Sequence, residues 1–272
     1  MNKIIEPNKA DKPAHGTGEW AAHNVNFQSG CRNRCSYCYA SAMAIRFGRK
    51  TPESWGIPEI DPEKVNRKYG KMSGRIMMPT SHDLDETNIE AYLKVLKKLL
   101  VAGNDVLVVS KPRLECIRRL CKELTAYKKQ ITFRFTIGSA DNTVLQAWEP
   151  GAPSFKERLA CLKHAFEKGY ATSVSCEPML DGDIHAVIRK AKPYVTDSIW
   201  LGVANRLRGT IAINRPGDAD MLAMANRLIG IMSKDFIHAL YRRYQGDTVI
   251  KFKDSIKKIV GLERPTVKGL DV

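Results

Sequence analysis

Strand-like and helix-like segments alternate along this chain from about residue 74 onward, and this alternation restricts the fold more than any other feature of the sequence. Short apolar segments typical of strands occupy residues 74–80, 105–110, 131–137, 171–177 and 198–205. Amphipathic segments typical of helices occupy residues 87–102, 113–127, 154–169, 183–192, 218–244 and 255–260. Thr87 and Glu90 are expected to form a capping box at the start of the first of these helices. Strands separated by single helices predict parallel βα units.

The two faces of the strand-like segments help to choose between a barrel and a flat sheet. In residues 131–137 (ITFRFTI), the apolar side chains lie on one face, and Thr, Arg and Thr lie on the other. In residues 171–177, Ser, Ser and Glu likewise oppose Val and Cys. A strand buried on both faces of an open α/β sheet would be apolar throughout. We therefore expect a complete or partial barrel with a polar interior, and a flat doubly wound sheet is the alternative.

Composition and charge limit the class of protein and its partners. The chain has 272 residues, of which 43% are hydrophobic and 27% charged, as in folded proteins. Its 44 Lys and Arg residues outnumber its 29 Asp and Glu residues, so the formal net charge is +15. Because phosphate backbones are common large anionic partners, DNA, RNA or a nucleotide is expected to bind.

The sequence also carries information on the compartment. No apolar run approaches the about 20 residues of a membrane span, and the polar residues 1–20 contain no apolar core of a secretory signal. We therefore expect a cytoplasmic protein with no membrane partner. The oligomeric state does not follow from the sequence.

Three of the seven cysteines are concentrated in residues 30–40, GCRNRCSYCYA, with the spacing C-x3-C-x2-C. A reducing compartment does not favour disulfides, so the grouping of Cys31, Cys35 and Cys38 indicates a metal centre. Three thiolates can ligate three irons of a 4Fe–4S cluster and leave the fourth iron to a non-protein ligand. A structural zinc site requires a fourth ligand, for which His23 or His82 is a candidate, and this site is the alternative.

The cysteine motif follows a first strand and precedes βα repeats, and it resembles the motif of the radical S-adenosylmethionine (SAM) superfamily. Within the superfamily, the chain is most similar to the spore photoproduct lyase-like branch. The segments that carry the resemblance are NFQSGCRNRCSYCYA (26–40), SHD (81–83), VSK (109–111), FRFTIGSAD (133–141), WEPGAPSFKER (148–158) and GYATSVSCEPM (169–179). They cover about residues 20–205, and the tail beyond matches no segment of the family.

The resemblance implies a single radical SAM domain over residues 1–272. Its core, over about residues 20–205, would be a partial (β/α)6 TIM-like barrel with the cluster loop after the first strand, and residues 206–272 would form a helical C-terminal extension. Cys31, Cys35 and Cys38 would ligate a 4Fe–4S cluster, and SAM would chelate the open iron. Reductive cleavage of SAM would yield a 5′-deoxyadenosyl radical that abstracts a hydrogen atom from the substrate. A reductant such as a flavodoxin or a ferredoxin would supply the electron.

The same resemblance suggests where SAM binds. Tyr37 corresponds to an aromatic residue near the adenine. Ser81 and Asp83 lie where the family binds the methionyl amino group, although the glycine pair of many members is missing, and an N-cap is the alternative role. Lys111 suits the SAM carboxylate, and an exposed turn lysine is the alternative.

Two further positions lie on the polar faces of their strands. By the same resemblance, Thr136 corresponds to a position where the family contacts the ribose. Glu177 aligns with a position near SAM where the family usually has a small residue, so this chain departs from the pattern there.

The source of the returned hydrogen atom is a second departure. The lyase branch uses a cysteine soon after the cluster, but this chain has no cysteine between residues 39 and 79, which argues against splitting of thymine dimers. Cys176 is a substitute hydrogen donor, although strand alternation places it against the helices, where a role in core packing is the alternative. We expect the substrate to be a nucleobase, a nucleotide or a nucleic acid. The alternatives are radical SAM chemistry on a peptide or small metabolite, and a zinc-stabilised, non-enzymatic nucleic-acid-binding protein.

Overall fold

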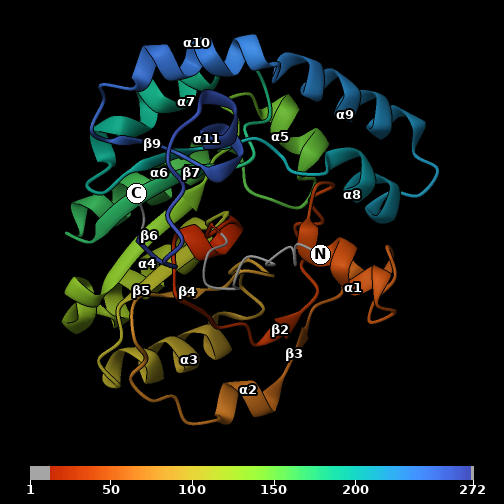
Figure 1. The fold of residues 1–272 in the computed structure, drawn as a ribbon. Helices are drawn as coiled ribbons and strands as arrows, with labels where there is room; N and C mark the ends of the chain where they lie inside the picture. Colours follow the sequence, from red (N-terminus) through yellow and green to blue (C-terminus); the bar gives the residue numbers. More distant parts are fainter. Residues whose placement is uncertain (1–12, 271–272) are drawn as a thin grey trace, which may run out of the picture.

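The computed structural model describes residues 13–270, which are built around a parallel sheet of seven strands (Figure 1). In spatial order the strands are β1 (His23–Asn24), β4 (Ile76–Met78), β5 (Val106–Ser110), β6 (Ile131–Thr136), β7 (Ala171–Cys176), β8 (Ile199–Leu201) and β9 (Ile250–Phe252). Because β1 and β9 form the two edges of this sheet, the barrel is partial, as predicted. Residues 1–12 of the polar N-terminal stretch lie outside the described residues.

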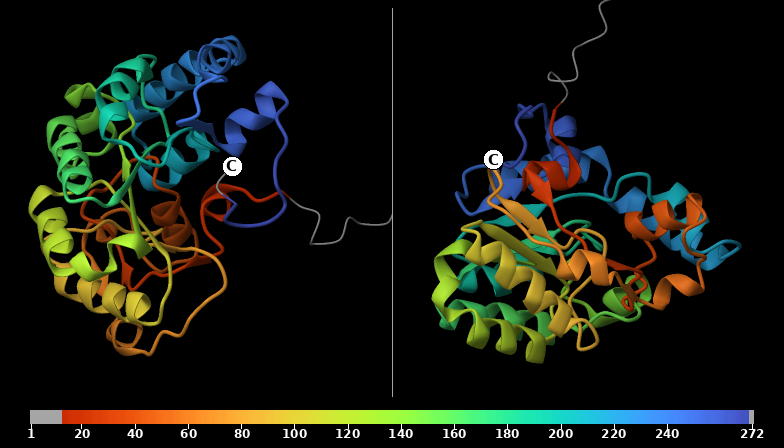
Figure 2. Two further views of the ribbon diagram at one scale, coloured as in Figure 1. Left: turned by 90° about the vertical axis from the view of Figure 1, so that its left-hand side faces the viewer. Right: turned by 90° about the horizontal axis from the view of Figure 1, so that it is seen from below.

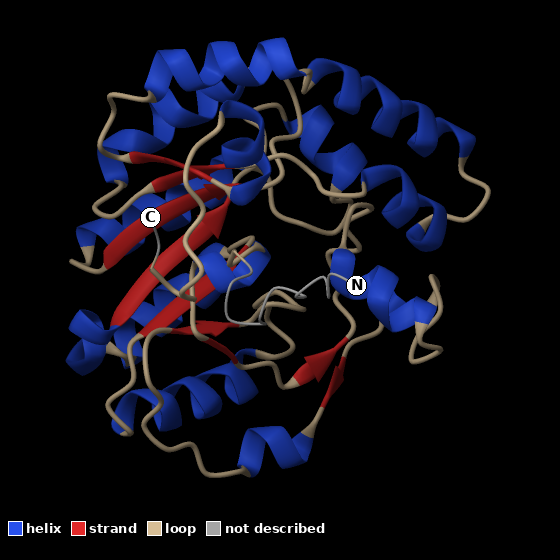
Figure 3. Ribbon diagram, in the orientation of Figure 1, coloured by secondary structure: helices blue, strands red, loops and turns tan. Residues whose placement is uncertain are grey.

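Helices connect successive strands and cover the outside of the sheet (Figures 2 and 3). They are α3 (Ile89–Val101), α4 (Leu114–Glu123), α5 (Asn142–Trp148), α6 (Phe155–Glu167) and α7 (Ile184–Ala191). All except α5 were predicted. The predicted capping box at Thr87 is wrong, because α3 begins two residues later and the Thr87 backbone N–H donates instead to the Asp85 carboxylate at 2.8 Å.

The two faces of the strands differ as the sequence predicted. The outward side chains, such as Phe133 and Phe135 of β6, belong to the main hydrophobic core together with the covering helices. The inward side chains are mixed: Met77, Leu107, Val109 and Trp200 form a small apolar cluster with Trp20 and Ala21. Arg134 pairs with Ser173 in the strand register, and Thr136 pairs with Ser175. The interior is therefore apolar in one part and polar where these four side chains meet.

The C-terminal extension is mostly helical, but it also supplies a strand that the sequence did not predict. Its helices are α8 (Leu207–Asn214), α9 (Ala219–Ile231), α10 (Lys234–Tyr244) and α11 (Asp254–Val260). Strand β9 pairs with β8 in parallel, with Lys251 opposite Trp200. Helix α8 packs against α1 (Tyr39–Arg46), the helix that follows the cysteine motif (Figure 1).

Three further short elements lie between β1 and β4 in the chain. Strand β2 (Gln28–Ser29) precedes α1 and strand β3 (Glu59–Ile60) follows it, and the two strands form an antiparallel pair. Helix α2 (Pro62–Asn66) follows β3. None of the helices within residues 13–270 combines the length and the apolar character that a bilayer-spanning helix requires.

Candidate active site

A cavity of about 540 Å³ lies at the C-terminal ends of the strands, where ligand sites of βα barrels gather. Its volume is within the range of small-molecule sites, roughly 300–1,000 Å³. Nine of the ten residues that the resemblance and the cysteine motif assign to the radical SAM site line this cavity: Cys31, Cys35, Tyr37, Cys38, Ser81, Asp83, Lys111, Thr136 and Glu177. The tenth, Cys176, is not among them.

The loop that carries the three cysteines is held by hydrogen bonds from three sides. The Cys31 backbone N–H donates to the Trp55 carbonyl at 2.9 Å, and the Ser36 N–H donates to the Trp148 carbonyl at 2.9 Å. The Asn214 side-chain amide of α8 donates to the carbonyls of Ser36 and Cys38, both at 2.9 Å. The positions of the cysteines are thus fixed by segments that are distant in sequence.

A close backbone contact explains one glycine beside this loop. The Gly151 N–H donates to the Asn33 carbonyl at 3.1 Å, and a Cβ atom at Gly151 would collide with the carbonyl oxygen of Arg32. Only glycine allows the two backbones to approach this closely.

The three thiols lie in a poorly solvated wall of the cavity. Cys31 and Cys35 are each 7% exposed, and Cys38 is half-buried. Burial, followed by the nearby Asp83 carboxylate and Cys38, raises the pKa of Cys31 to about 12. Burial also raises the pKa of Cys35. Without a cation the neutral thiols are favoured, so a metal that binds here must displace protons. Within residues 13–270, no three His, Cys, Asp or Glu side chains lie close enough to share a single ion.

Asp83 and Lys111 form an ion pair next to the thiols. The Asp83 carboxylate accepts hydrogen bonds from the Ser110 hydroxyl at 2.9 Å, the Lys111 backbone N–H at 2.7 Å and the Asn33 amide at 2.9 Å. Its second oxygen lies 3.8 Å from Lys111 Nζ and 3.9 Å from Cys31 Sγ. Burial alone would raise the pKa of Asp83, but Lys111 and the three hydrogen bonds outweigh it and lower the pKa. The carboxylate is therefore held ionised and in one orientation.

The Lys111 side chain is only 12% exposed and lies in the same wall, so Lys111 is not an exposed turn lysine. Burial opposes its charge, but the surrounding Cys35, Tyr37, Asp83 and Glu149 raise its pKa above the usual value. Its ammonium nitrogen also lies 5.7 Å from the centroid of the Tyr37 ring. The ammonium therefore stays protonated at the cavity.

Tyr37 is anchored at its hydroxyl by a buried ion pair. The hydroxyl donates to Glu149, whose other oxygen pairs with Arg158, and both charged side chains are fully buried. The Arg158 guanidinium also donates to the carbonyl of Thr136 at 3.1 Å and so connects Tyr37 to the end of β6. This network fixes the Tyr37 ring at the cavity wall.

Behind Glu177 and Trp20, which line the cavity, lies a buried charged group that draws on both ends of the described chain. The Lys253 ammonium lies 2.8 Å from Glu19, 3.4 Å from Glu177 and 3.9 Å from the centroid of the Trp20 ring. Lys253 is fully buried, while Glu177 and Trp20 line the cavity. Burial raises the pKa of Glu177, and Lys253 partly offsets this effect.

The structure bears on the alternative roles of two residues. Cys176 is fully buried in the main hydrophobic core and faces the helices, so its position does not support a role as hydrogen donor. Asp83 is not an N-cap either, because α3 begins at Ile89 with Asn88 as its N-cap. Sequence reasoning missed Asn33, Glu149, Lys253 and Asn214. Asn33 and Glu149 lie inside motifs that were recognised, but nothing in the sequence indicated Lys253 or Asn214.

Comparison with known families identifies the class. Residues 25–188, more than half of the chain, match the family model of the radical SAM superfamily. The chain therefore belongs to this superfamily and is a radical SAM enzyme, and membership implies SAM and an iron–sulfur cluster as cofactors.

The individual relatives are distant. The uncharacterized protein ORF301 of Acidianus two-tailed virus is 26% identical over 194 residues, a match that covers 65% of this chain and 63% of that protein. A spore photoproduct lyase variant solved with a dinucleoside spore photoproduct is 14% identical with a TM-score of 0.56, covering 91% of this chain and 80% of that one. Streptococcus suis SuiB bound to SAM is 11% identical with a TM-score of 0.52, covering 91% and 54%. At these identities the structural likenesses establish the fold alone.

Proposed function

We propose that this radical SAM enzyme holds a 4Fe–4S cluster through Cys31, Cys35 and Cys38 and acts on a nucleobase, either in a nucleotide or in DNA or RNA. When bound, the cluster supplies one electron to SAM, whose cleavage provides a 5′-deoxyadenosyl radical for hydrogen abstraction. The observation that carries this proposal is that the three thiols and the Asp83–Lys111 ion pair meet at one cavity.

The residues present fit such a cluster. A cluster with four irons takes each thiolate on a different iron, so its cysteines lie further apart than the ligands of one ion. Three thiols that line one wall, without the close spacing of a single-ion site, are compatible with this arrangement. The zinc-stabilised, non-enzymatic alternative disagrees with the family membership.

Asp83 and Lys111 suit the amino-acid end of SAM, which carries an ammonium and a carboxylate. The ionised Asp83 would accept hydrogen bonds from the ammonium, and the protonated Lys111 would pair with the carboxylate. Because both side chains are largely covered and fixed by neighbours, these contacts cost little reordering. Ser81 would add a hydroxyl beside the same ammonium.

The remaining cavity residues would hold the nucleoside part of SAM. Tyr37, fixed through Glu149, would pack near the adenine, and the Thr136 hydroxyl would bind a ribose hydroxyl. Glu177 would orient a polar group of SAM or the substrate, with Lys253 behind it to balance part of its charge.

The substrate class is supported by charge. The formal net charge of +15 favours phosphate-bearing molecules over neutral metabolites. The peptide alternative draws on one relative of similar fold, SuiB, whose structure was also solved with its precursor peptide SuiA.

Anaerobic reconstitution tests both parts of the proposal. The purified chain should bind iron and sulfide, become brown, and form 5′-deoxyadenosine from SAM when reduced with dithionite or with a flavodoxin or ferredoxin. With perdeuterated oligonucleotides, deuterium should appear in the 5′-deoxyadenosine. Failure to cleave SAM with an intact cluster would refute the chemistry, whereas transfer of deuterium only from peptides would refute the substrate class.

A further inference from the structure

Helix α1 has an inverted distribution of side chains. Its buried face consists of small residues, Ala40, Ser41, Ala42 and Ala44, which pack near α8. Its solvent face carries the large ones: Tyr39, Met43 and Phe47, the residue that caps the helix, are 54%, 42% and 63% exposed. Large apolar side chains normally face the core, so an exposed row of them marks an interaction site.

These side chains form one continuous row. At about 100° per residue, Tyr39, Met43, Arg46 and Phe47 fall within roughly 100° of the helix circumference. We call these four residues the α1 stripe. They are all of the exposed residues from Tyr39 to Phe47, and three of the four are apolar or aromatic.

The stripe begins at the rim of the cavity. Tyr39 lines the cavity and donates its hydroxyl to the Thr80 carbonyl at 2.7 Å, while its ring remains largely exposed. From there the row runs outward along α1 to Phe47. A molecule lying on the stripe therefore reaches the cavity without leaving the protein surface.

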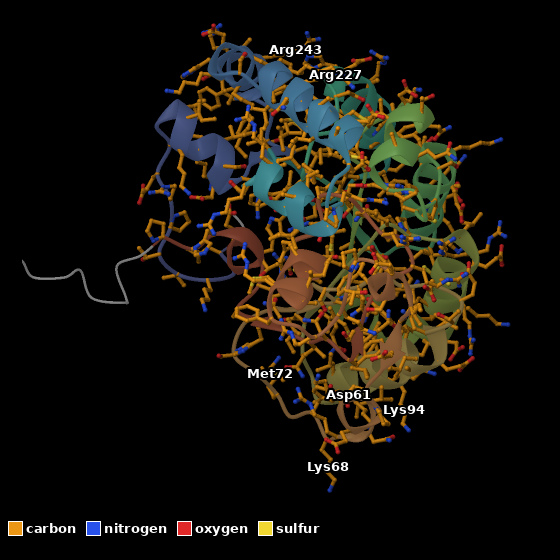
Figure 4. The ribbon with its side chains drawn as sticks, turned by 90° about the vertical axis from the view of Figure 1, so that its right-hand side faces the viewer. Asp61, Lys68, Met72, Lys94, Arg227 and Arg243 are labelled. Atoms are coloured by element: carbon orange, nitrogen blue, oxygen red, sulfur yellow. The ribbon has the colours of Figure 1, made fainter. Side chains whose placement is uncertain are left out.

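The charge around the stripe is positive. Residues 31–50 contain no Asp or Glu, and Arg32, Arg34, Arg46 and Arg49 are all exposed. Within the described part of the chain, Arg46 and Arg49 form no ion pair, and the Arg49 guanidinium lies 5.6 Å from the centroid of the Phe47 ring. Figure 4 shows α1 facing the viewer, with Arg227 of α9 and Arg243 of α10 at the upper edge of the same side.

We propose that the α1 stripe is the platform on which an unpaired segment of DNA or RNA stacks while the target nucleotide enters the cavity. This inference rests on the proposed function and names the surface that its substrate uses. Exposed aromatic side chains interleaved with arginines are the means by which proteins bind single strands without reading their sequence. A second copy of the chain is a poorer fit, because a dimer would bring the same positive charges together. Another protein is also a poorer fit, because its binding would not require two exposed aromatic rings.

The spacing of the stripe matches stacked bases. Residues four apart along a helix are separated by about 6 Å, close to twice the 3.4 Å rise between neighbouring bases of one strand. One base can therefore enter between successive side chains of the stripe. Arg46 and Arg49 then lie beside the backbone phosphates.

Fluorescence anisotropy with a labelled single-stranded DNA of mixed sequence tests the platform on the reconstituted protein. Phe47→Ala should weaken binding about fivefold or more, because one base–aromatic stack is lost. Phe166→Ala is the matched control, because Phe166 is also a partly exposed phenylalanine but lies on α6. The Phe166→Ala variant should bind the strand with the affinity of the wild type. The duplex of the same sequence should bind more weakly than the single strand, because its bases are already stacked.

A second variant separates stacking from charge. Arg46→Gln with Arg49→Gln should reduce the slope of log affinity against log salt by about 1.4, or about 0.7 per phosphate contact on a single strand. Phe47→Ala should leave this slope unchanged.

The inference is overturned if Phe47→Ala and Phe166→Ala bind alike, if the wild type does not bind the strand, or if Phe47→Ala instead dissociates a homodimer or abolishes binding of an acidic flavodoxin. The proposed function is judged separately, by whether the wild type forms 5′-deoxyadenosine with dithionite.

Discussion

Two charged regions at the cavity are built in opposite ways. The first, which we call the cysteine end, consists of Cys31, Cys35, Cys38, Asp83 and Lys111, and each residue lies in a short motif directly after a strand or in the cysteine loop. The second, the lysine end, consists of Glu19, Glu177 and Lys253, which the fold gathers from positions up to 234 residues apart (253 − 19 = 234). We infer that the cysteine end provides the chemistry and that the lysine end mainly closes and stabilises the interior.

The largest expected effect is a loss of metal content, which should follow from a change at the cysteine end. Cys35→Ala should leave the reconstituted protein without its iron–sulfur cluster and reduce SAM cleavage to background, because three thiolates are the minimum for the proposed site. Iron and sulfide analysis and the visible spectrum measure the loss. Cys116→Ala, a buried cysteine of α4, should retain iron. Normal iron content in Cys35→Ala would contradict the assignment of the cysteine end.

A change at the lysine end should lower the stability of the protein and leave its metal content unchanged. Lys253→Met leaves the buried Glu19 and the half-buried Glu177 without this cation, and breaking such a buried ion pair typically costs about 3–5 kcal/mol of unfolding free energy. Urea unfolding monitored by circular dichroism measures this loss, and iron bound per folded chain should stay constant.

Two companion variants sharpen this result. Lys258→Met removes the ion pair of an exposed lysine with Asp254, which keeps Arg264 as a second partner, and should cost less than about 1 kcal/mol. Adding Glu177→Gln to Lys253→Met should recover part of the loss, because it removes one uncompensated carboxylate. If Lys253→Met kept its stability but lost iron, the division between the two ends would be wrong.

The same division explains what could be predicted from sequence. The strands β4 to β8 follow from apolar periodicity and polar strand faces, and the three cysteines follow from their spacing. Asp83 and Lys111 were predicted from the resemblance of their short motifs to the family. Strand β9 (Ile250–Phe252) lies in the segment VIKFK, where lysines break up the apolar run, and its position depends on pairing with β8. Lys253 therefore reads as one more lysine of a basic tail, although it is fully buried. Strand β9 and the burial of Lys253 depend on pairing between segments that are far apart in the chain, and a short stretch of sequence carries no signal for such pairing.

His82 is the neighbour of Asp83 in the cysteine end, and its buried ring should make the stability of the protein depend on pH. Within the described residues, neither ring nitrogen of His82 has a hydrogen-bond partner, and its ring packs edge-on against Phe27 with 4.7 Å between centroids. Burial lowers the pKa of His82 to about 4. The unfolded chain takes up this proton near pH 6.5, earlier than the folded chain does, so stability falls as the pH drops from 7 towards 4.

We expect the wild type to lose on the order of 2 kcal/mol between pH 7 and pH 5 through this residue. His82→Phe should remove that part of the pH dependence, as measured by urea unfolding at both pH values. His238→Phe, at a half-buried position on α10, is the control and should follow the wild-type pH profile. An unchanged slope in His82→Phe would place the acid sensitivity elsewhere.

The smallest expected effect bears most directly on the comparison, because it concerns a place where the C-terminal extension supports the cysteine end. Asn214 of α8 holds the carbonyls of Ser36 and Cys38, and no local motif supplies these two hydrogen bonds. Asn214→Ala should weaken the loop by about 1 kcal/mol, because water replaces part of what is lost. This corresponds to about fivefold faster removal of iron by a chelator. Asn226→Ala, the same change on the neighbouring α9, should release iron at the wild-type rate. Equal rates for the two variants would mean that the motif and its nearest neighbours hold the loop alone, whereas faster release from Asn214→Ala would mean that the cysteine end, too, depends on the distant part of the chain.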